Sequence, residues 1–240
     1  MYIIGIHLDY IQGVGIAMQF TYRHFITPHK VVTPFFILSL MYIYDNTSVG
    51  SLVYLALHGT YCINWLLKEA IFPDKSWDRE LPLWRFVLAT LTMPNYWWAP
   101  WLLISRGTEP HKYTIFAAVV LNILGTFVNY CCDAQKYFVL AERPGLITNG
   151  FFAYSRNLNY LGEILLYLGF AILAEDPLPL GFLLGMVVLV FYPKMWEKDN
   201  SLSRHKDFQA YKENTWLMFP RLNFAGVQKP TNGKKIKNLQ

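Results

Sequence analysis

Residues 113–132 read YTIFAAVVLNILGTFVNYCC and contain no Asp, Glu, Lys or Arg. A helix needs roughly 20 predominantly apolar residues to cross the hydrocarbon core of a bilayer. The stretch has that length and that composition. It therefore predicts a transmembrane helix.

Further apolar stretches flank this one without a soluble-looking break, at residues 33–45, 49–71, 83–105, 160–175 and 179–196. Residues 2–20 are more polar and predict a partly buried or interfacial helix. Charged residues make up 15% of the chain, against about 25% in soluble domains. The sequence therefore predicts one all-α, polytopic membrane bundle of about 6–7 transmembrane helices. Several stretches are short, so we expect helices that pack on one another and continue into the aqueous phase.

The positive charge is concentrated near the C-terminus. Residues 1–193 hold 11 Lys+Arg against 12 Asp+Glu, whereas residues 194–240 hold 10 against 4, a net charge of +6. Basic flanks are retained on the cytoplasmic side of a membrane. We therefore expect the tail and the loops 21–34, 72–82 and 133–158 in the cytoplasm. The charge pattern does not decide whether the protein lies in the endoplasmic reticulum membrane or in the mitochondrial inner membrane. The lysine cluster at 234–237 is too short to predict binding of nucleic acid.

The three cysteines fall inside apolar runs and lack the spacing of a metal site, so no metal is expected. Two predicted helices, in contrast, carry polar side chains at helical spacing. The first stripe is His58, Tyr61, Trp65 and Lys68, and the second is Asn122, Thr126, Asn129, Asp133 and Lys136. Such side chains either bond across helices, at about 0.6 kcal/mol per pair, or face a cavity. For Asn129, Asp133 and Lys136, near the mouth of the bundle, a cofactor and a structural role both remain open.

The loop at residues 144–163, PGLITNGFFAYSRNLNYLGE, is dense in polar groups. Arg156 precedes a predicted helix, where a guanidinium favours phosphate or carboxylate. Glu163 lies in an otherwise apolar helix and needs a donor, either a ligand hydroxyl or amide or Arg156 itself. The density of polar groups favours a ligand site.

The end of this loop, RNLNYLGE at 156–163, resembles the R-x-P-N-Y-L-G-E signature of a membrane superfamily, with Leu158 in place of the proline. That superfamily includes steroid 5-alpha-reductases, sterol C14-reductases, isoprenylcysteine carboxyl methyltransferases and phospholipid N-methyltransferases. The chain looks most similar to its DUF1295 branch, also through the runs at 57–61, 65–68, 72–74 and 198–204. The similarity spans roughly residues 50–222.

The resemblance implies a multi-helix fold with a cytosol-facing cofactor pocket. It divides the chain into a transmembrane domain at 1–196 with a cofactor loop at 133–163, a cytosolic tail at 197–224 that closes the pocket, and a polar extension at 225–240. In the reductases, NADPH is held by residues that match Asn129, Asp133 and Asn159. The full set expected to bind the cofactor is Asn129, Asp133, Lys136, Arg156, Asn159, Tyr160, Glu163 and Tyr211. In the methyltransferases, a similar pocket holds S-adenosylmethionine.

The substrate end departs from the steroid reductases. Ala56 replaces a tyrosine two residues before the position of His58, and no glutamate precedes Glu69. The sequence WEKDN at 196–200 replaces a His-rich run. These departures indicate that the substrate is not a 3-oxosteroid or that the chemistry has been lost.

Three functions follow as hypotheses. The first is NADPH-dependent reduction of an activated C=C bond in a steroid-like or other lipid, with Tyr61 or His58 as the acid. The second is an S-adenosylmethionine-dependent methyltransferase acting on a phospholipid or on isoprenylcysteine. The third is a catalytically idle accessory subunit of a larger membrane complex, such as a respiratory one, with protein partners in addition to bilayer lipids.

Overall fold

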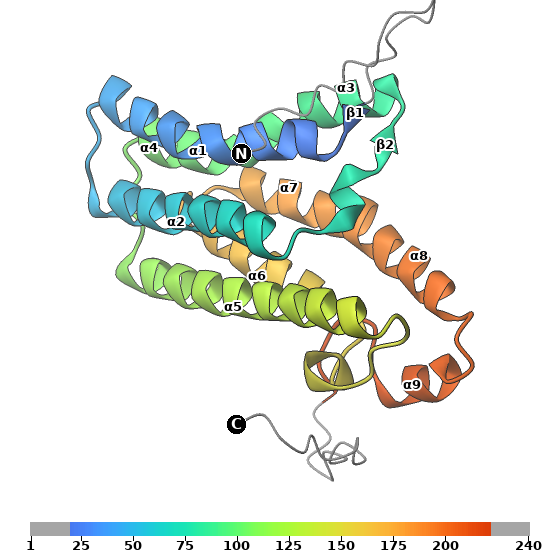
Figure 1. Ribbon diagram of the computed structural model, residues 1–240. Helices are drawn as coiled ribbons and strands as arrows, with labels where there is room; N and C mark the ends of the chain where they lie inside the picture. The colour runs from blue at the N-terminus through green and yellow to red at the C-terminus, as the bar shows by residue number, and fades with distance from the viewer. Residues whose placement is uncertain (1–19, 222–240) are drawn as a thin grey trace, which may run out of the picture.

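The computed structural model describes residues 20–221, and nearly all of their regular structure is helical (Figure 1). The α-helices are α1 (Arg23–Ile43), α2 (Val49–Ile71), α3 (Leu83–Thr92), α4 (Trp98–Ser105), α5 (Lys112–Glu142), α6 (Leu158–Leu173), α7 (Pro177–Met186), α8 (Tyr192–Leu202) and α9 (Phe208–Asn214). Short helical turns are η1 (Lys75–Asp78), η2 (Met93–Trp97), η3 (Gly150–Ala153) and the π-helical η4 (Val187–Phe191). Strand β1 (Phe20–Thr21) pairs antiparallel with β2 (Glu80–Leu81).

Three helical segments are long and apolar enough to cross a bilayer, namely Arg23–Ile43, Lys112–Glu142 and Pro177–Leu202. Helix α6 is apolar but shorter. The protein is therefore an all-α membrane bundle, as the sequence predicted. The figure of about 6–7 transmembrane helices stays a prediction.

The helix boundaries differ from the predicted ones in two places that matter for function. The predicted span at 33–45 begins at Arg23 instead, because α1 packs against α2 and α4 and continues past Pro28 and Pro34. The loop predicted at 21–34 is therefore wrong, and Lys30 lies inside a helix with 4% of its surface exposed. Helix α5 likewise runs to Glu142, so the predicted loop at 133–158 starts ten residues too early.

Two other apolar stretches also end differently. The predicted span at 83–105 is divided into α3 and α4 by η2, which has Pro94 in its first turn. Proline lacks the N–H that an α-helix needs at an interior position. The predicted span at 179–196 instead continues through the π-helical turn η4 to Leu202, beyond the predicted domain boundary at 196.

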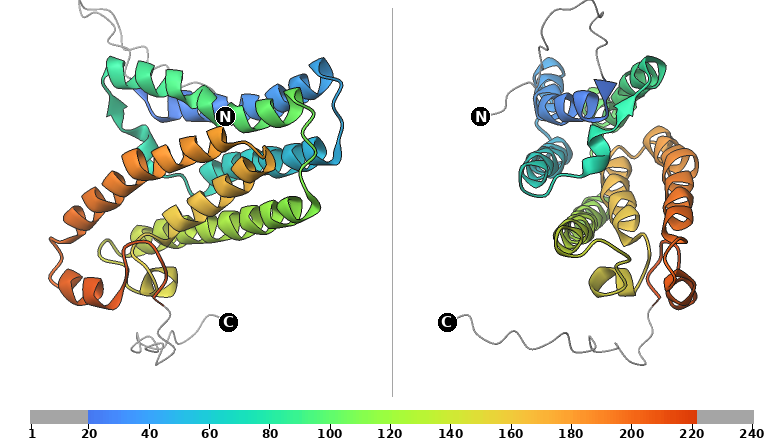
Figure 2. Two further views of the ribbon diagram at one scale, coloured as in Figure 1. Left: turned by 180° about the vertical axis from the view of Figure 1, so that it is seen from behind. Right: turned by 45° about the vertical axis from the view of Figure 1, so that its right-hand side comes forward.

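Helices α5 and α6 lie against each other along their length (Figure 2, left). Glycines allow this approach. A Cβ atom added to Gly125 would lie 2.4 Å from the backbone nitrogen of Leu166, and one added to Gly162 would lie 2.6 Å from that of Asn129. These distances are shorter than real Cβ contacts, so only glycine fits at both positions.

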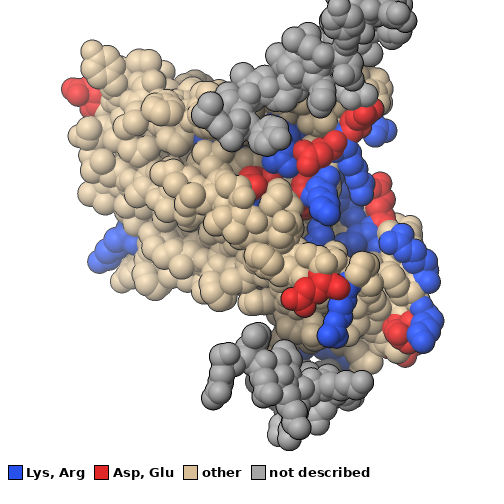
Figure 3. Space-filling view, in the orientation of Figure 1, with Lys and Arg blue, Asp and Glu red and all other residues tan. Residues whose placement is uncertain are grey.

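Charged side chains gather at one end of the bundle, near β2, α8 and α9 (Figure 3). We refer to this as the charged end. The location of that end in the cytoplasm stays a prediction. Apart from residue 20, the interfacial helix predicted at 2–20 lies outside the described residues, and so does the polar extension predicted at 225–240.

Candidate functional site

A buried cluster of one lysine and two tyrosines lies between α1, α2 and α6. Lys30 Nζ donates to Tyr61 Oη and to Tyr167 Oη, each over 3.3 Å. The two phenol oxygens are 3.2 Å apart. Lys30 Nζ also lies 4.3 Å from the centre of the Tyr61 ring. We call these three residues the Lys–Tyr cluster.

The Lys–Tyr cluster is unusual because its lysine has no acidic partner in the part of the chain that the structure describes. Among residues 20–221, no carboxylate lies within ion-pair distance of Lys30. An unpaired ammonium group in a membrane helix is costly and usually marks a functional site. The Tyr61 ring offsets part of that cost through its π-electrons. The cluster can therefore polarise an oxygen atom or supply a proton.

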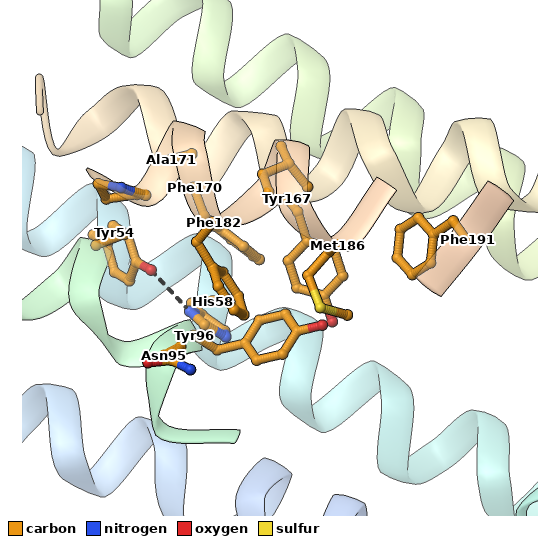
Figure 4. A pocket seen from close by; sticks show the side chains of 13 residues that line it. Tyr54, His58, Asn95, Tyr96, Tyr167, Phe170, Ala171, Phe182, Met186 and Phe191 are labelled. Carbon is orange, nitrogen blue, oxygen red and sulfur yellow. Dashed lines mark hydrogen bonds between the residues drawn. The ribbon is translucent and has the colours of Figure 1, made fainter. Parts of the chain in front are cut away.

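An aromatic pocket lies beside the Lys–Tyr cluster, and Tyr167 belongs to both (Figure 4). Tyr96 and Tyr167 direct their hydroxyl groups toward the same part of the pocket, with their ring centroids 5.1 Å apart. His58 stacks on Phe170 at 4.2 Å. The free volume of the pocket is about 30 Å³, which is room for one or two water molecules.

His58, one of the two predicted catalytic residues, lies in the wall of this pocket. Its Nδ1 is 3.1 Å from the hydroxyl of Tyr54, and its Nε2 is buried without a partner among residues 20–221. A buried polar atom without a hydrogen bond carries an energetic cost, and a ligand or water can remove it. The arrangement therefore leaves one imidazole nitrogen available to a molecule in the pocket. Tyr61, the other predicted catalytic residue, is in the Lys–Tyr cluster.

Ion pairs join α1, α2 and α5 at the charged end. Lys68 Nζ lies 3.1 Å from Asp133 Oδ2 and 3.0 Å from Glu69 Oε1. Glu69 in turn accepts from Arg23 over 2.8 Å. Asp133, predicted to bind the cofactor, is therefore already paired with a buried lysine of the other polar stripe.

Lys136 is more accessible, with its side chain 41% exposed and 3.5 Å from Asp74. The pKa of Asp74 is lowered from its ordinary value. Burial opposes this shift, but Lys136 and the hydrogen bond from the Ser76 N–H outweigh burial. Asp74 is thus a carboxylate that holds a lysine at the mouth of the bundle.

Two of the predicted cofactor residues meet where α5 and α6 are closest. Asn129 Nδ2 donates to the backbone oxygen of Asn159 over 3.0 Å. The side-chain oxygen of Asn159 is buried without a partner among the described residues. An amide or hydroxyl of a ligand would satisfy that oxygen. Tyr160, in the next position, packs on Phe191 at 5.4 Å.

Arg156 is bound by the tail through two of its guanidinium nitrogens. Its Nε lies 3.0 Å from Asp199 Oδ2, and both side chains are less than 10% exposed. Its Nη1 donates to the carbonyl oxygens of Lys212 and Thr215. Arg156 therefore pairs with Asp199. It does not pair with Glu163, for which the sequence suggested either Arg156 or a ligand as the partner. Its predicted contact with a cofactor stays a prediction.

The tail is docked on the loop before α6. Ser155 Oγ donates to the Met218 carbonyl over 2.8 Å, and Asn157 Nδ2 donates to that of Leu217 over 3.0 Å. Tyr211, predicted to bind the cofactor, donates its hydroxyl to the Phe152 carbonyl over 2.8 Å. Burial raises the pKa of Tyr211. The hydroxyl therefore remains protonated and holds α9 against η3.

Three residues of this region were not singled out from the sequence. Lys30 was assigned to a loop, Tyr167 reads as one more aromatic in an apolar helix, and Asp199 lies among other tail charges. A lysine between two apolar runs is the one signal that could have indicated a buried cation. Nothing in the sequence pairs Asp199 with Arg156, because 43 positions separate them.

The family assignment rests on the part of the chain that runs from α4 to α9. The model of DUF1295, described as a protein of unknown function, matches residues 91–215, slightly more than half of the chain. The chain belongs to the DUF1295 family. This confirms the branch to which the sequence looked most similar. A search of curated proteins gives no match.

The DUF1295 match divides the candidate site. It covers α4 to α9, with Asn129, Asn159, Arg156 and the docked tail. Lys30, His58 and Tyr61 precede it. The charged-end half of the site is thus within the DUF1295 region, and two members of the Lys–Tyr cluster are outside it.

Proposed function

We propose that this DUF1295 protein is a membrane reductase that uses NADPH to reduce a C=C bond conjugated to a carbonyl group in a lipid. The observation that carries the proposal is the Lys–Tyr cluster, a buried proton source beside an aromatic pocket. When bound, NADPH would supply a hydride to the β-carbon of the double bond. Asn129, Asn159 and Lys136 are the residues that would hold it at the charged end.

The chain's own residues would handle the proton. Tyr61 donates its hydroxyl proton as the carbonyl of the lipid gains negative charge. Lys30, 3.3 Å from that phenol oxygen, stabilises the resulting phenolate, because a cation beside an anion lowers its energy most where water is excluded. Tyr167 shares the charge through its own hydrogen bond. His58 orients the lipid through its free Nε2.

A thermal-stability titration in detergent tests cofactor binding. NADPH at about 100 times its dissociation constant stabilises a fold by ~2.7 kcal/mol. We expect that shift in the wild-type protein and its loss in Asn129→Ala and Asn159→Ala. Asn122→Ala is the matched control, since Asn122 bonds Leu166 within the same helix pair, far from the charged end. S-adenosylmethionine in a parallel titration tests the methyltransferase hypothesis, which replaces ours if only that ligand stabilises the protein.

The acid is tested by Tyr61→Phe, which removes the proton and keeps the ring. General acid catalysis contributes typically 10²–10⁴-fold to a rate, so turnover of an enone lipid should fall by about that factor. NADPH binding should be unchanged. Unchanged turnover would remove Tyr61 from the mechanism.

One observation favours a second candidate, the accessory subunit. The pocket of about 30 Å³ holds no lipid without rearrangement of its walls. Purification in mild detergent distinguishes the two candidates. Stoichiometric protein partners, together with no shift by either cofactor, would favour the subunit.

A further inference from the structure

Tyr130 connects the two halves of the candidate site. It lies on α5, within the part of the chain that matches DUF1295, and its hydroxyl donates to the backbone carbonyl oxygen of Tyr61 over 3.3 Å. The two phenol rings are stacked, with their centroids 6.4 Å apart and their planes at 24°. Tyr61 lies on α2, outside the matched part. The contact is therefore a direct link from the DUF1295 region to the Lys–Tyr cluster.

The Tyr130 hydroxyl is not needed to complete the backbone of α2. Inside an α-helix a carbonyl oxygen accepts from the N–H four residues later, and Tyr61 lies in the interior of Val49–Ile71. A carbonyl oxygen has two lone pairs, so it can accept a second hydrogen bond. A phenylalanine at position 130 would preserve the ring stacking. The bond from Tyr130 therefore adds a restraint on the position of Tyr61.

Tyr61 is restrained by three neighbouring helices. Its phenol oxygen is 3.3 Å from Lys30 Nζ of α1 and 3.2 Å from Tyr167 Oη of α6, while Tyr130 of α5 bonds its carbonyl oxygen. Only 5% of its surface is exposed. Glu163 of α6 forms no ion pair with a described residue, so its predicted contact with the cofactor stays a prediction. Since an acid must lie within hydrogen-bond reach of the atom that it protonates, these restraints decide where Tyr61 can act.

The same turn of α5 also contacts the cofactor end of the site. Asn129, the residue before Tyr130, donates to the backbone oxygen of Asn159 over 3.0 Å. The helices are close there, because a Cβ atom added to Gly162 would lie 2.6 Å from the backbone nitrogen of Asn129. Close-packed interiors transmit displacements between neighbouring groups. A shift of this turn on cofactor binding would therefore also move the contact between Tyr130 and Tyr61.

We propose that Tyr130 is a positioning residue, which holds Tyr61 where it can donate its proton. Through the same turn of α5, it links that position to cofactor binding at Asn129 and Asn159. The inference rests on the proposed reductase function. Tyr130 acts only through Tyr61, since its own hydroxyl donates to a backbone oxygen.

The kinetics of Tyr130→Phe, which removes the hydroxyl and keeps the ring, test the positioning role. A misplacement of about 1 Å can cost 10²-fold in rate, so kcat for an enone lipid should fall by about 10- to 100-fold. The KM for the lipid and the dissociation constant for NADPH should stay within about twofold of the wild type, because the loss affects only the transition state. In a Tyr61→Phe background, Tyr130→Phe should have no further effect, because residues that act as a unit are not additive.

Tyr113→Phe is the matched control. Tyr113 is an exposed residue of α5 whose hydroxyl bonds no described residue, and its loss should leave kcat unchanged. An unchanged kcat in Tyr130→Phe would overturn the proposal. Independent effects of Tyr130→Phe and Tyr61→Phe would also overturn it.

Infrared spectroscopy tests the same role without substrate. In protein that carries isotope-labelled tyrosine, the phenol C–O band of Tyr61 is identified by its loss in Tyr61→Phe. That band responds to the hydrogen bonds of the phenol oxygen, so it should shift in Tyr130→Phe and not in Tyr113→Phe. An unshifted band in Tyr130→Phe would overturn the positioning role.

The same band tests the link to the cofactor. Bound NADPH should move the Tyr61 band in the wild type and leave it in place in Tyr130→Phe. If NADPH binds and any other pattern is found, the link is overturned. Absence of NADPH binding to the wild type would instead refute the proposed function, and the cofactor-free shift in Tyr130→Phe would still decide whether Tyr130 positions Tyr61.

Discussion

Loss of the Arg156 side chain should release the tail. In Arg156→Met, Asp199 is left as a buried carboxylate without its partner, and two tail carbonyl oxygens lose a donor. Removal of one partner from a buried ion pair costs about 3–5 kcal/mol. Because 1.4 kcal/mol is a factor of ten in an equilibrium constant, this cost means that the docked tail should open about 100- to 4,000-fold more often.

Hydrogen exchange measures this opening directly. The Arg221 N–H, which donates to the Tyr154 carbonyl over 2.8 Å, is a reporter of the docked tail. We expect it to exchange about 100- to 4,000-fold faster in Arg156→Met, and amides in α2 to exchange at their wild-type rates. Arg204→Met is the matched control, because that exposed arginine bonds only Ser201 among the described residues.

A double variant tests whether the ion pair is the cause. In Arg156→Met with Asp199→Leu no buried charge is left unpaired, so the tail should open less often than in the single variant. The reasoning is refuted if Arg156→Met exchanges like the wild type. It is also refuted if the two substitutions simply add, because contacting residues should show coupling.

Two further predictions follow from the helix pair and from the mouth of the bundle. Gly162→Ala should destabilise the fold by about 1–3 kcal/mol, because its Cβ would collide with the backbone of α5. Gly181→Ala is the control and should not destabilise the fold, because a Cβ atom at position 181 would meet no described atom within 4 Å. Equal melting temperatures of the two variants in detergent would contradict the close approach of α5 and α6. The lowered pKa of Asp74 means that its carboxylate stabilises the fold above its unfolded-state pKa of about 4, and that this stability is lost as the pH falls through the folded-state pKa. Asp74→Asn should therefore flatten the acid side of a stability–pH curve, and Lys136→Met should do so in part; an unchanged curve in both variants would show that the pair contributes nothing.

The sequence was most informative where physical chemistry is local. Apolar length predicted the membrane helices, and the limits of α2 were predicted correctly as 49–71. Helical spacing also predicted that Asn129 would lie on a polar face, and the structure brings it to Asn159. These features depend on neighbours within a few turns of one helix.

Long-range features could not be predicted in the same way. Lys30 belongs to a helix only because α1 packs against its neighbours past two prolines, and packing leaves no local signal. Its phenol partners come from positions 31 and 137 residues away. Likewise, the close approach of α5 to α6 depends on where Gly125 and Gly162 meet, which composition alone does not fix.

The docking of the tail on the loop has a consequence for how the protein is made. A chain leaves the ribosome from its N-terminus, and domains form as their parts emerge. Asn157 bonds the carbonyl of Leu217, 60 residues later, so α6 can enter the membrane well before its preceding loop has its final partners. During that interval Arg156 has no Asp199 to pair with. A chain that stops before position 199 would keep α1, α5 and α6 but lose the end of the Pro177–Leu202 segment and carry this unpaired charge, and cellular quality control would be expected to remove it.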